Sequence, residues 1–545
     1  MFARFPRFQR QPRPAPGYFE RPRAARSITW LLLAAMLLLA LLLGAVIGLS
    51  SPVLITILGG SIFVLLFFIL LDSYQMLQAM LVLTFVIQGM AVYFLRNRQA
   101  PWVVVGLAVI FLMRAMMDMT FSRRDPVKPV IGRADSGALV ALLLFFVCFF
   151  VSALLNRAKL AQLVVAVKST LPMFGVLLAL AWMRWQPARL QRIWTIMIGV
   201  MLVQLPVVFY QHFFISTRRT QASHDAVVGT FGGNPEGGGN SAIMVMFVIG
   251  IMAYAMARWD KGLMGRKMMM FICGIGLAII LLGEVKAAFI WLPLASCFVL
   301  RQRVMKNVMS FAVYSILGVA LCGVIYLTYD ALYWGKLIDK HQGVSAKLEA
   351  GGGYFFDPRS VNYETGEVGR GAALAIWAGD RLASIPTRLI GYGPGAIKSS
   401  SGLGMGPLYK RFAPLHVDVT TMAVLLWDVG LIGTGAYLAI LLFGLRAGWR
   451  LLGSGRGDPA QQAMLEASVA SLIMFLSLTI YNRTLMDDPG AELFFVLCLG
   501  CVIQLSRYSP AAAVATAPAR PAPAGRVALG GTRPGVVRLA RPVHG

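Results

Sequence analysis

The chain has 545 residues, of which 58% are hydrophobic and only 13% are charged, and its mean hydropathy is +0.71. A soluble domain could not bury that much apolar surface, so the composition excludes a soluble globular protein. The 50 Lys and Arg outnumber the 23 acids, for a formal net charge of +27. In a membrane protein, cationic loops and tails lie against anionic lipid, so we expect membrane lipid and no nucleic acid as the partner of this charge.

Apolar runs of about 18 residues or more recur along the chain and predict membrane-spanning helices. Such helices satisfy their own backbone hydrogen bonds in lipid. The sequence therefore predicts an all-α, polytopic transmembrane bundle of about 12 to 14 helices. The candidate spans are residues 28–49, 52–71, 73–95, 101–121, 136–155, 160–183, 190–214, 238–258, 267–283, 285–300, 305–328, 416–446, 462–483 and 490–506.

This pattern divides the chain into five regions. Residues 1–27 and 507–545 are basic tails rich in Pro, Ala or Gly, for which we predict disorder. Residues 28–328 hold the first eleven predicted spans, and residues 416–506 hold the last three. Between them, residues 329–415 form the only long segment with a soluble-like composition, and a loop of that length is usually functional.

The positive-inside rule predicts that both termini are cytoplasmic. It puts "SRRDPVKPVIGR", "RWQPARLQR", "DKGLMGRK", "RQRVMK" and "RAGWRLLGSGR" inside, and residues 329–415 and "LMDDPGAE" (485–492) outside. The short basic segments "RNRQ" (96–99) and "NRAK" (156–159) are exceptions. Four of the five histidines, which suit proton transfer, then lie on the outer side; they are His212, His224, His341 and His416.

The first outer segment, residues 216–242, carries Arg218 and Arg219 before the Gly- and Asn-rich run "GTFGGNPEGGGNSA". Glycine-rich backbone that opens a helix presents free N–H groups to an anion, and two arginines strengthen that preference. A flexible loop with ordinary interfacial arginines explains the same residues. Farther along, Glu284 and Lys286 interrupt a long apolar stretch, where charges pair or line a cavity. A purely structural ion pair explains Glu284 and Lys286 as well as a functional site does.

The long outer segment predicts an amphipathic helix over Arg370–Ala383, placed over the membrane mouth. The "GYGPGAIKS" run that follows (391–399) lacks the glycine spacing of a nucleotide-binding loop, so it predicts a turn rather than a phosphate grip by Lys398. His416 and Asp418 then stand where the chain returns to the membrane, ahead of a "GLIGTG" patch suited to close helix packing.

The order of these motifs resembles the O-antigen ligase and O-antigen polymerase superfamily of bacterial envelope glycan assembly. The resemblance covers residues from about 200 to 505 and rests on "GTFGGNPEGGGNSA", "GRGAALAIW", "LIGYGPGA" and the His-led "WDVGLIGTGAYL". It implies a glycosyltransferase of the bacterial inner membrane whose donor is a glycan linked to a polyprenyl lipid by pyrophosphate. Family members use no nucleotide and no obligatory metal, so the resemblance implies no cofactor.

The resemblance also implies roles for single residues. His416 corresponds to the general base for the acceptor hydroxyl, and Arg370 and Arg218 or Arg219 to residues that bind the pyrophosphate. General chemistry agrees, because guanidinium groups stabilise a departing pyrophosphate and imidazole suits a proton transfer near neutral pH. Lys286 stands where the family often has arginine. Supporting roles fall to Asp418, Glu284 and His224.

From this resemblance we expect a polymerase of lipid-linked repeat units, for exopolysaccharide, capsule or O-antigen. An O-antigen ligase that transfers glycan to lipid A–core is the near alternative, and a polysaccharide transporter or flippase is an alternative of a different class. A structural scaffold would explain the tails but not the outer His and Arg residues. Other polysaccharide assembly or export proteins are candidate partners. Asp487 and Asp488 have no family role.

Overall fold

The computed structural model describes residues 69–97, 99–121, 137–183, 185–216, 226–233, 240–283, 285–329, 352–400, 404–455 and 457–508. The chain divides into two compact units, residues 1–72 and 73–545, and the helices named below all belong to the second unit. The predicted span 28–49, almost all of span 52–71 and almost all of the two basic tails lie outside the described residues.

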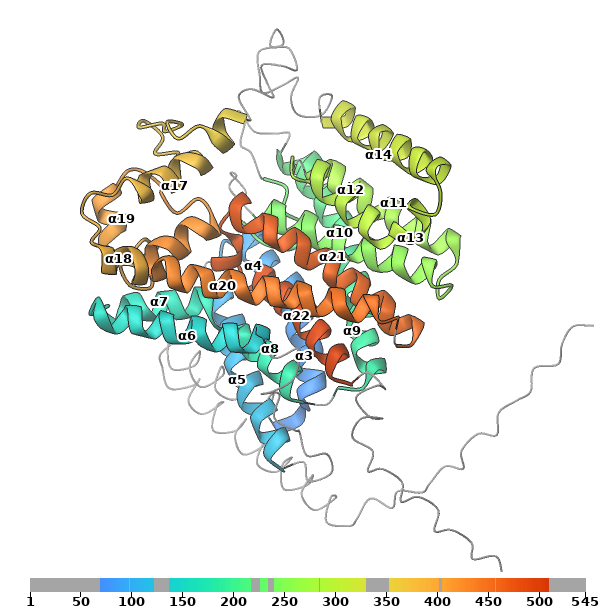
Figure 1. Ribbon diagram of the computed structural model, residues 1–545, viewed down its shortest axis with the longest axis horizontal. Helices are drawn as coiled ribbons and strands as arrows, with labels where there is room; N and C mark the ends of the chain where they lie inside the picture. Colours follow the sequence, from blue (N-terminus) through green and yellow to red (C-terminus); the bar gives the residue numbers. More distant parts are fainter. Residues whose placement is uncertain are drawn as a thin grey trace, which may run out of the picture. The chain divides into compact units, whose positions relative to one another are not determined.

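Ten helical segments of the described part are long and apolar enough to cross a membrane, which confirms the predicted all-α polytopic bundle (Figure 1). The first combines α3 (Ser73–Val82), the π-helical turn η1 (Leu83–Ile87) and α4 (Gln88–Phe94). The others are α5 (Ala100–Phe121), α6 (Gly137–Leu155), α9 (Pro187–Tyr210) with η2 (Gln211–Ile215), α10 (Ser241–Asp260), α11 (Arg266–Gly283), α14 (Val308–Tyr329), α20 (Thr421–Gly453), α21 (Pro459–Tyr481) and α22 (Pro489–Tyr508).

Two predicted spans differ from simple membrane-crossing helices. The predicted span 160–183 is a bent pair, α7 (Leu160–Thr170) and α8 (Phe174–Trp182), whose axes meet at 53°. Pro172 lies in the break, and proline cannot donate the backbone hydrogen bond that would continue α7. The predicted span 285–300 is the 12-residue helix α12 (Ala288–Val299), followed by the single turn α13 (Arg301–Val304).

The centre of the bundle is built around α10 and α22, in each of which 94% of the most apolar window is buried. Aromatic rings fill the space between them and their neighbours. Phe494 of α22 packs 5.2 Å from Phe247 of α10 and 5.5 Å from Phe475 of α21, measured between ring centroids. By contrast only 6% of the α14 window is buried, so α14 is a peripheral helix (Figure 1).

Segments that the alternation of the predicted spans assigns to the outer side meet at one end of the bundle. The Tyr93 hydroxyl donates to the Ala226 carbonyl at 3.1 Å, and the Asn156 amide donates to the Gly391 carbonyl at 3.1 Å. Asn156 belongs to "NRAK", one of the two exceptions to the charge rule. The positive charge of "NRAK" predicts the inner side, whereas the alternation of the spans predicts the outer side. The bond between Asn156 and Gly391 agrees with the alternation.

The predicted inner segments meet at the opposite end. Arg303 of α13 pairs with Asp260 at the end of α10, and Lys261 pairs with Glu466 near the start of α21. Tyr74, at the start of α3, lies against Trp185 with ring centroids 6.1 Å apart. The alternation of spans predicted from the sequence is therefore consistent with the three-dimensional arrangement of the described helices.

The described part of the long outer segment contains short helices and a two-stranded ribbon. These are α17 (Arg370–Ala378), α18 (Ile385–Ile390), β1 (Ser399–Ser400) paired antiparallel with β2 (Gly404–Met405), and α19 (Pro407–Phe412). Figure 1 shows α17, α18 and α19 grouped beside α6 and α7. The predicted helix over Arg370–Ala383 was too long by five residues, because the chain leaves helical geometry at Gly379 and Asp380 before Ser384 caps α18.

The "GYGPGAIKS" run is attached to a break in α20. Gly430 has φ 66° and ψ −167°, which interrupts the helix and leaves carbonyls without helical partners. The backbone N–H of Tyr392 donates to the Trp427 carbonyl at 2.8 Å, and that of Gly393 to the Asp428 carbonyl at 3.1 Å. The run is therefore a turn, as predicted, and it is anchored to a membrane helix.

Candidate functional site

A short hairpin places His416 and Arg370 in one neighbourhood. Val361 and Val368 form an isolated antiparallel bridge, and α17 begins two residues later at Arg370. At the tip of this hairpin, Gly366 has φ 74°, and its carbonyl accepts the backbone N–H of His416 at 2.8 Å. A Cβ on Gly366 would lie 2.3 Å from the Pro414 carbonyl oxygen, so this close approach requires glycine.

The Arg370 guanidinium lies among three aromatic rings. Its central carbon is 3.9 Å from the Phe355 ring centroid, 4.1 Å from that of Tyr481 and 5.2 Å from that of Tyr354. Rings stacked on a guanidinium cover its faces and leave its N–H edges available to an anion. Among the described residues, no carboxylate forms an ion pair with Arg370.

The His416 side chain is exposed, and its nearest aromatic neighbour is Tyr409, whose ring centroid lies 6.5 Å away. His416 stands five residues before the first residue of α20, in extended backbone that Thr420 terminates by capping the helix. Asp418, predicted as a supporting residue, is buried, and its carboxylate pairs with Arg483 rather than with the imidazole. The structure thus leaves the imidazole open to a ligand.

Four charged side chains behind His416 form a chain of ion pairs, which we call the outer ion-pair network: Asp418, Arg483, Asp487 and Lys398. The Arg483 Nη1 donates to Asp418, and its Nε donates to Asp487 at 2.8 Å. The Lys398 Nζ pairs with the other carboxylate oxygen of Asp487 at 2.7 Å. Asp487, for which the sequence suggested no role, is the centre of this network.

Lys398, which the sequence did not favour as a phosphate ligand, bonds three neighbouring groups of the protein. Its side chain is 8% exposed, and its Nζ also donates to the Ser169 hydroxyl at 2.8 Å and the Met486 carbonyl at 2.6 Å. Three acceptors satisfy all three ammonium protons. Lys398 therefore joins the "GYGPGAIKS" turn to α7 and to the loop before α22, and it does not grip a phosphate.

Two members of the outer ion-pair network, Asp487 and Arg483, have pKa values shifted toward their charged forms. Burial acts to raise the pKa of Asp487, but the charges of Lys398 and Arg483 outweigh it and hold that pKa below its usual range. Burial likewise opposes the charge of Arg483, and the carboxylates of Asp487 and Asp418 outweigh it and raise the guanidinium pKa. Among its four members, two cations pair with two anions, and in the described part of the chain none of its carboxylates pairs with Arg370.

The described part of the Gly- and Asn-rich segment is buried and tightly hydrogen-bonded, unlike a flexible loop. The Gln211 side chain accepts the N–H groups of Val228 and Gly229 and donates to the Gly229 carbonyl at 2.8 Å. The Gln204 side chain bonds both the backbone N–H and the hydroxyl of Thr230. These bonds fix residues 226–233 against the inner faces of α4 and α9.

That segment ends beside the outer ion-pair network. The Asn240 amide donates to the Asp488 carboxylate at 3.1 Å, and the Ala491 N–H donates to its other oxygen at 2.8 Å. Burial raises the pKa of Asp488 to about 7 despite these donors. Asp488 thus ties the start of α10 to the start of α22, next to Asp487.

The remaining predicted site residues are less well placed. Lys286 is exposed in the turn that opens α12, one turn before Trp291, whose ring lies 5.3 Å from that of Tyr481 beneath Arg370. The turn is therefore at the same end of the bundle as Arg370. The other predicted residues lie outside the described part of the chain; they are Arg218, Arg219, His224 and Glu284.

Two buried carboxylates lie deeper in the bundle. Asp428 in α20 accepts the Gly395 N–H at 2.9 Å through one oxygen, and its other oxygen has no partner among the described residues. Glu492 in α22 likewise has an oxygen without a described partner. Sequence reasoning missed both, although a carboxylate within an apolar span is a recognisable signal.

Comparison with models of known protein families finds no match to this chain, and no curated protein sequence matches it significantly.

Proposed function

We propose that this protein polymerises oligosaccharide repeat units linked to a polyprenyl lipid by pyrophosphate, at the outer face of the bacterial inner membrane. One observation carries the proposal: Arg370, which forms no ion pair with a described residue, and an exposed imidazole, His416, are connected by one hairpin at a single end of a membrane helix bundle. A guanidinium that can bind pyrophosphate and an imidazole that can accept a proton suit a lipid-linked donor.

The proposed reaction is a displacement at the anomeric carbon of the donor sugar. His416 takes the proton of the acceptor hydroxyl, and the acceptor oxygen forms a new bond to that carbon. The bond from the same carbon to the pyrophosphate oxygen breaks, and polyprenyl pyrophosphate leaves with the electron pair. Arg370 stabilises the negative charge that develops on the leaving group through its free N–H edges.

The outer ion-pair network supports this role indirectly. Because Asp418 and Asp487 are each paired with Arg483 or Lys398, neither carboxylate is available to neutralise Arg370. The aromatic rings hold the guanidinium without contributing a negative charge, so it remains attractive to a pyrophosphate. Lys286, and Arg218 or Arg219 beyond the described residues, are proposed as further contacts to the same group.

The acceptor distinguishes a polymerase from a ligase, and the displacement step is the same in both. We favour the polymerase because the residues that resemble the family's ligase branch differ here: Val417 and Asp418 follow the histidine, and Val285 and Lys286 replace a Ser-Arg pair. Other polysaccharide assembly and export proteins are the proposed protein partners.

A second candidate function, an ion-coupled transporter for an anionic glycan, is favoured by Asp428 and Glu492. Both carboxylates are buried in membrane-crossing helices and each has an oxygen without a partner in the described part of the chain. Ionisable residues at such depth mark ion or proton pathways in transporters. This function would need the buried carboxylates and would not need His416.

The test is complementation of a deletion strain with His416→Ala, Arg370→Ala and Glu492→Gln variants, followed by glycan analysis. We expect single lipid-linked repeat units to accumulate in the first two and normal polymer in the third. Arg359→Ala is the matched control, because Arg359 is an exposed arginine of the same outer segment. Normal polymer with His416→Ala and Arg370→Ala would refute the proposal, and full-length unattached chains in the deletion strain would indicate a ligase.

A further inference from the structure

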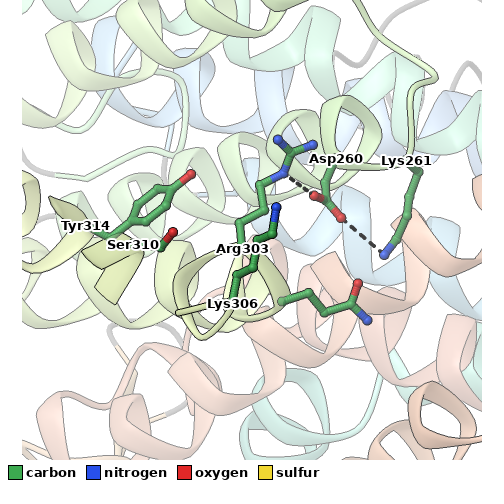
Figure 2. Close-up of a pocket in the computed structure, with 7 residues that line it drawn as sticks. Asp260, Lys261, Arg303, Lys306, Ser310 and Tyr314 are labelled. Atoms are coloured by element: carbon green, nitrogen blue, oxygen red, sulfur yellow. Dashed lines mark hydrogen bonds and ion pairs between the residues drawn. The ribbon is translucent and has the colours of Figure 1, made fainter. Parts of the chain in front are cut away.

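A second charged site lies at the opposite end of the bundle, away from His416. It is a pocket of about 520 Å³ between the end of α10, the turn α13 and the first turns of α14 (Figure 2). Three cations, one carboxylate and two hydroxyl groups line it; the lining residues are Asp260, Lys261, Gln302, Arg303, Lys306, Ser310 and Tyr314. We call it the inner basic pocket.

The cations of this pocket are only partly neutralised. Arg303 pairs with Asp260 through its Nε at 2.5 Å, and its guanidinium stacks 4.1 Å from the Trp259 ring centroid. Among the described residues, its two Nη groups have no hydrogen-bond partner. Lys261 divides its ammonium between Asp260 at 3.3 Å and Glu466 at 3.2 Å. Lys306 is exposed and forms no ion pair with a described residue, so positive charge remains.

Hydroxyl donors stand opposite these cations. Ser310 and Tyr314 are four residues apart and therefore share one face of α14. Figure 2 shows both hydroxyls on one side of the pocket, Asp260 and Lys261 on the other, and Arg303 and Lys306 between them. The pocket also borders the N-terminal end of α14, where the helix dipole favours an anion. Guanidinium, ammonium and hydroxyl donors together match the oxygens of a phosphate group.

Exposed apolar residues stand next to the pocket residues in sequence, and we call them the apolar rim. Met305 is 78% exposed, Val308 85% and Met309 73%, and all three lie within three residues of Lys306. Only 6% of the α14 window is buried, and most residues of α14 are exposed. A free phosphate would make no use of this apolar surface. A phospholipid would place its phosphate in the pocket and its acyl chains along α14.

We propose that the inner basic pocket binds the phosphate of an anionic phospholipid headgroup. The residues that bind it are Arg303 through its Nη groups, Lys306, Ser310 and Tyr314. The pocket belongs to the end of the bundle that the charge rule predicts to be cytoplasmic, where anionic lipid attracts basic residues. Lipid held there would fasten α14, which has few protein contacts, to α10 and α13.

The test measures lipid binding by native mass spectrometry of the full-length protein in detergent, with phosphatidylglycerol and phosphatidylcholine added separately. We expect wild type to retain phosphatidylglycerol in preference to phosphatidylcholine. Arg303→Gln combined with Lys306→Gln should weaken phosphatidylglycerol binding roughly tenfold or more. Lys306→Gln combined with Tyr314→Phe provides a second variant that leaves the Asp260 pair intact. Lys267→Gln is the matched control, since Lys267 is exposed at the same end but does not line the pocket.

The lipid and a free phosphate are separated by competition. Added inorganic phosphate at equal concentration should displace little of the bound phosphatidylglycerol, because it lacks contacts with the apolar rim. Equal retention of phosphatidylglycerol by wild type and both double variants would overturn the proposal. Displacement by phosphate as effective as that by phosphatidylglycerol itself would overturn the assignment to a lipid.

Discussion

Replacement of Lys398 by Met tests the outer ion-pair network. Lys398 links the outer segment to α7 and to the loop before α22 through Ser169, Met486 and Asp487. Methionine keeps most of the length of the side chain and removes its charge and its three donors. Among the described residues, Asp487 would keep one ion pair, with Arg483, and the more distant charge of Lys168.

The structure sets the size of the expected effect. Removal of one partner from a fully buried ion pair costs about 3 to 5 kcal/mol, and exposed pairs contribute about 0 to 1 kcal/mol. The Lys398 side chain is 8% exposed but that of Asp487 is 36% exposed, so solvent screens one end of the pair. We therefore expect Lys398→Met to lower the free energy of unfolding by about 2 to 3 kcal/mol.

The assay is reversible unfolding of the purified protein by titration of sodium dodecyl sulfate in mixed micelles. A double-mutant cycle with Lys398→Met and Asp487→Asn isolates the interaction between the two side chains. Lys410→Met is the control, because Lys410 is an exposed lysine of the same outer segment. It should leave the free energy of unfolding unchanged within about 0.5 kcal/mol.

A coupling energy below about 0.5 kcal/mol in this cycle would refute the reasoning, since that is the value of an exposed pair. The same conclusion would follow if Lys398→Met and Lys410→Met lowered the stability equally.

Three further predictions concern the backbone, pH and the guanidinium. A Cβ at Gly391 or Gly430 would lie 2.5 Å from backbone of the other segment, and both residues have positive φ, so Gly391→Ala and Gly430→Ala should each reduce thermal stability. The control Gly435→Ala, whose new Cβ would meet nothing within 4 Å, should leave thermal stability unchanged. Equal melting temperatures for the three variants would contradict this prediction. Asp488 has a pKa of about 7 in the fold and a usual value of 3.8, so the folded protein binds more protons between these values. The free energy of unfolding of wild type, relative to that of Asp488→Asn, should therefore fall as pH rises from about 4 to about 7. Curves of unfolding free energy against pH that run parallel for the two proteins would contradict this prediction. Arg370→Lys keeps the charge but loses the planar donors, so turnover of lipid-linked donor should fall about tenfold or more; wild-type turnover would count against the guanidinium contact.

The helices and their alternation were predictable from sequence because hydrophobic length and loop charge are local signals. The runs that became α10, α21 and α22 are each long enough to cross a membrane, and a hydrogen bond holds the predicted outer ends of α10 and α22 together. The bend between α7 and α8 also had a local signal, Pro172 within the apolar run, that the prediction of a single span did not use.

The site was less predictable because its contacts connect residues far apart in sequence. Lys398 and Asp487 are 89 residues apart, and neither residue type indicates its partner. The backbone hydrogen bond that attaches His416 to the hairpin before Arg370 depends on the positive φ of Gly366. Two residues separate Arg483 from "MDDP", and a cation so close to two acids is the one signal that could have directed attention to the network.

The most direct test of the central claim is polymerisation by purified protein in liposomes supplied with a polyprenyl-pyrophosphate-linked repeat unit. The products are measured by chain length and by released polyprenyl pyrophosphate. The proposed function predicts that wild type forms oligomers and releases one polyprenyl pyrophosphate per new linkage, and that His416→Ala and Arg370→Ala form none. The account is contradicted if both variants elongate the glycan at the rate of wild type, or if folded wild type forms no new linkage.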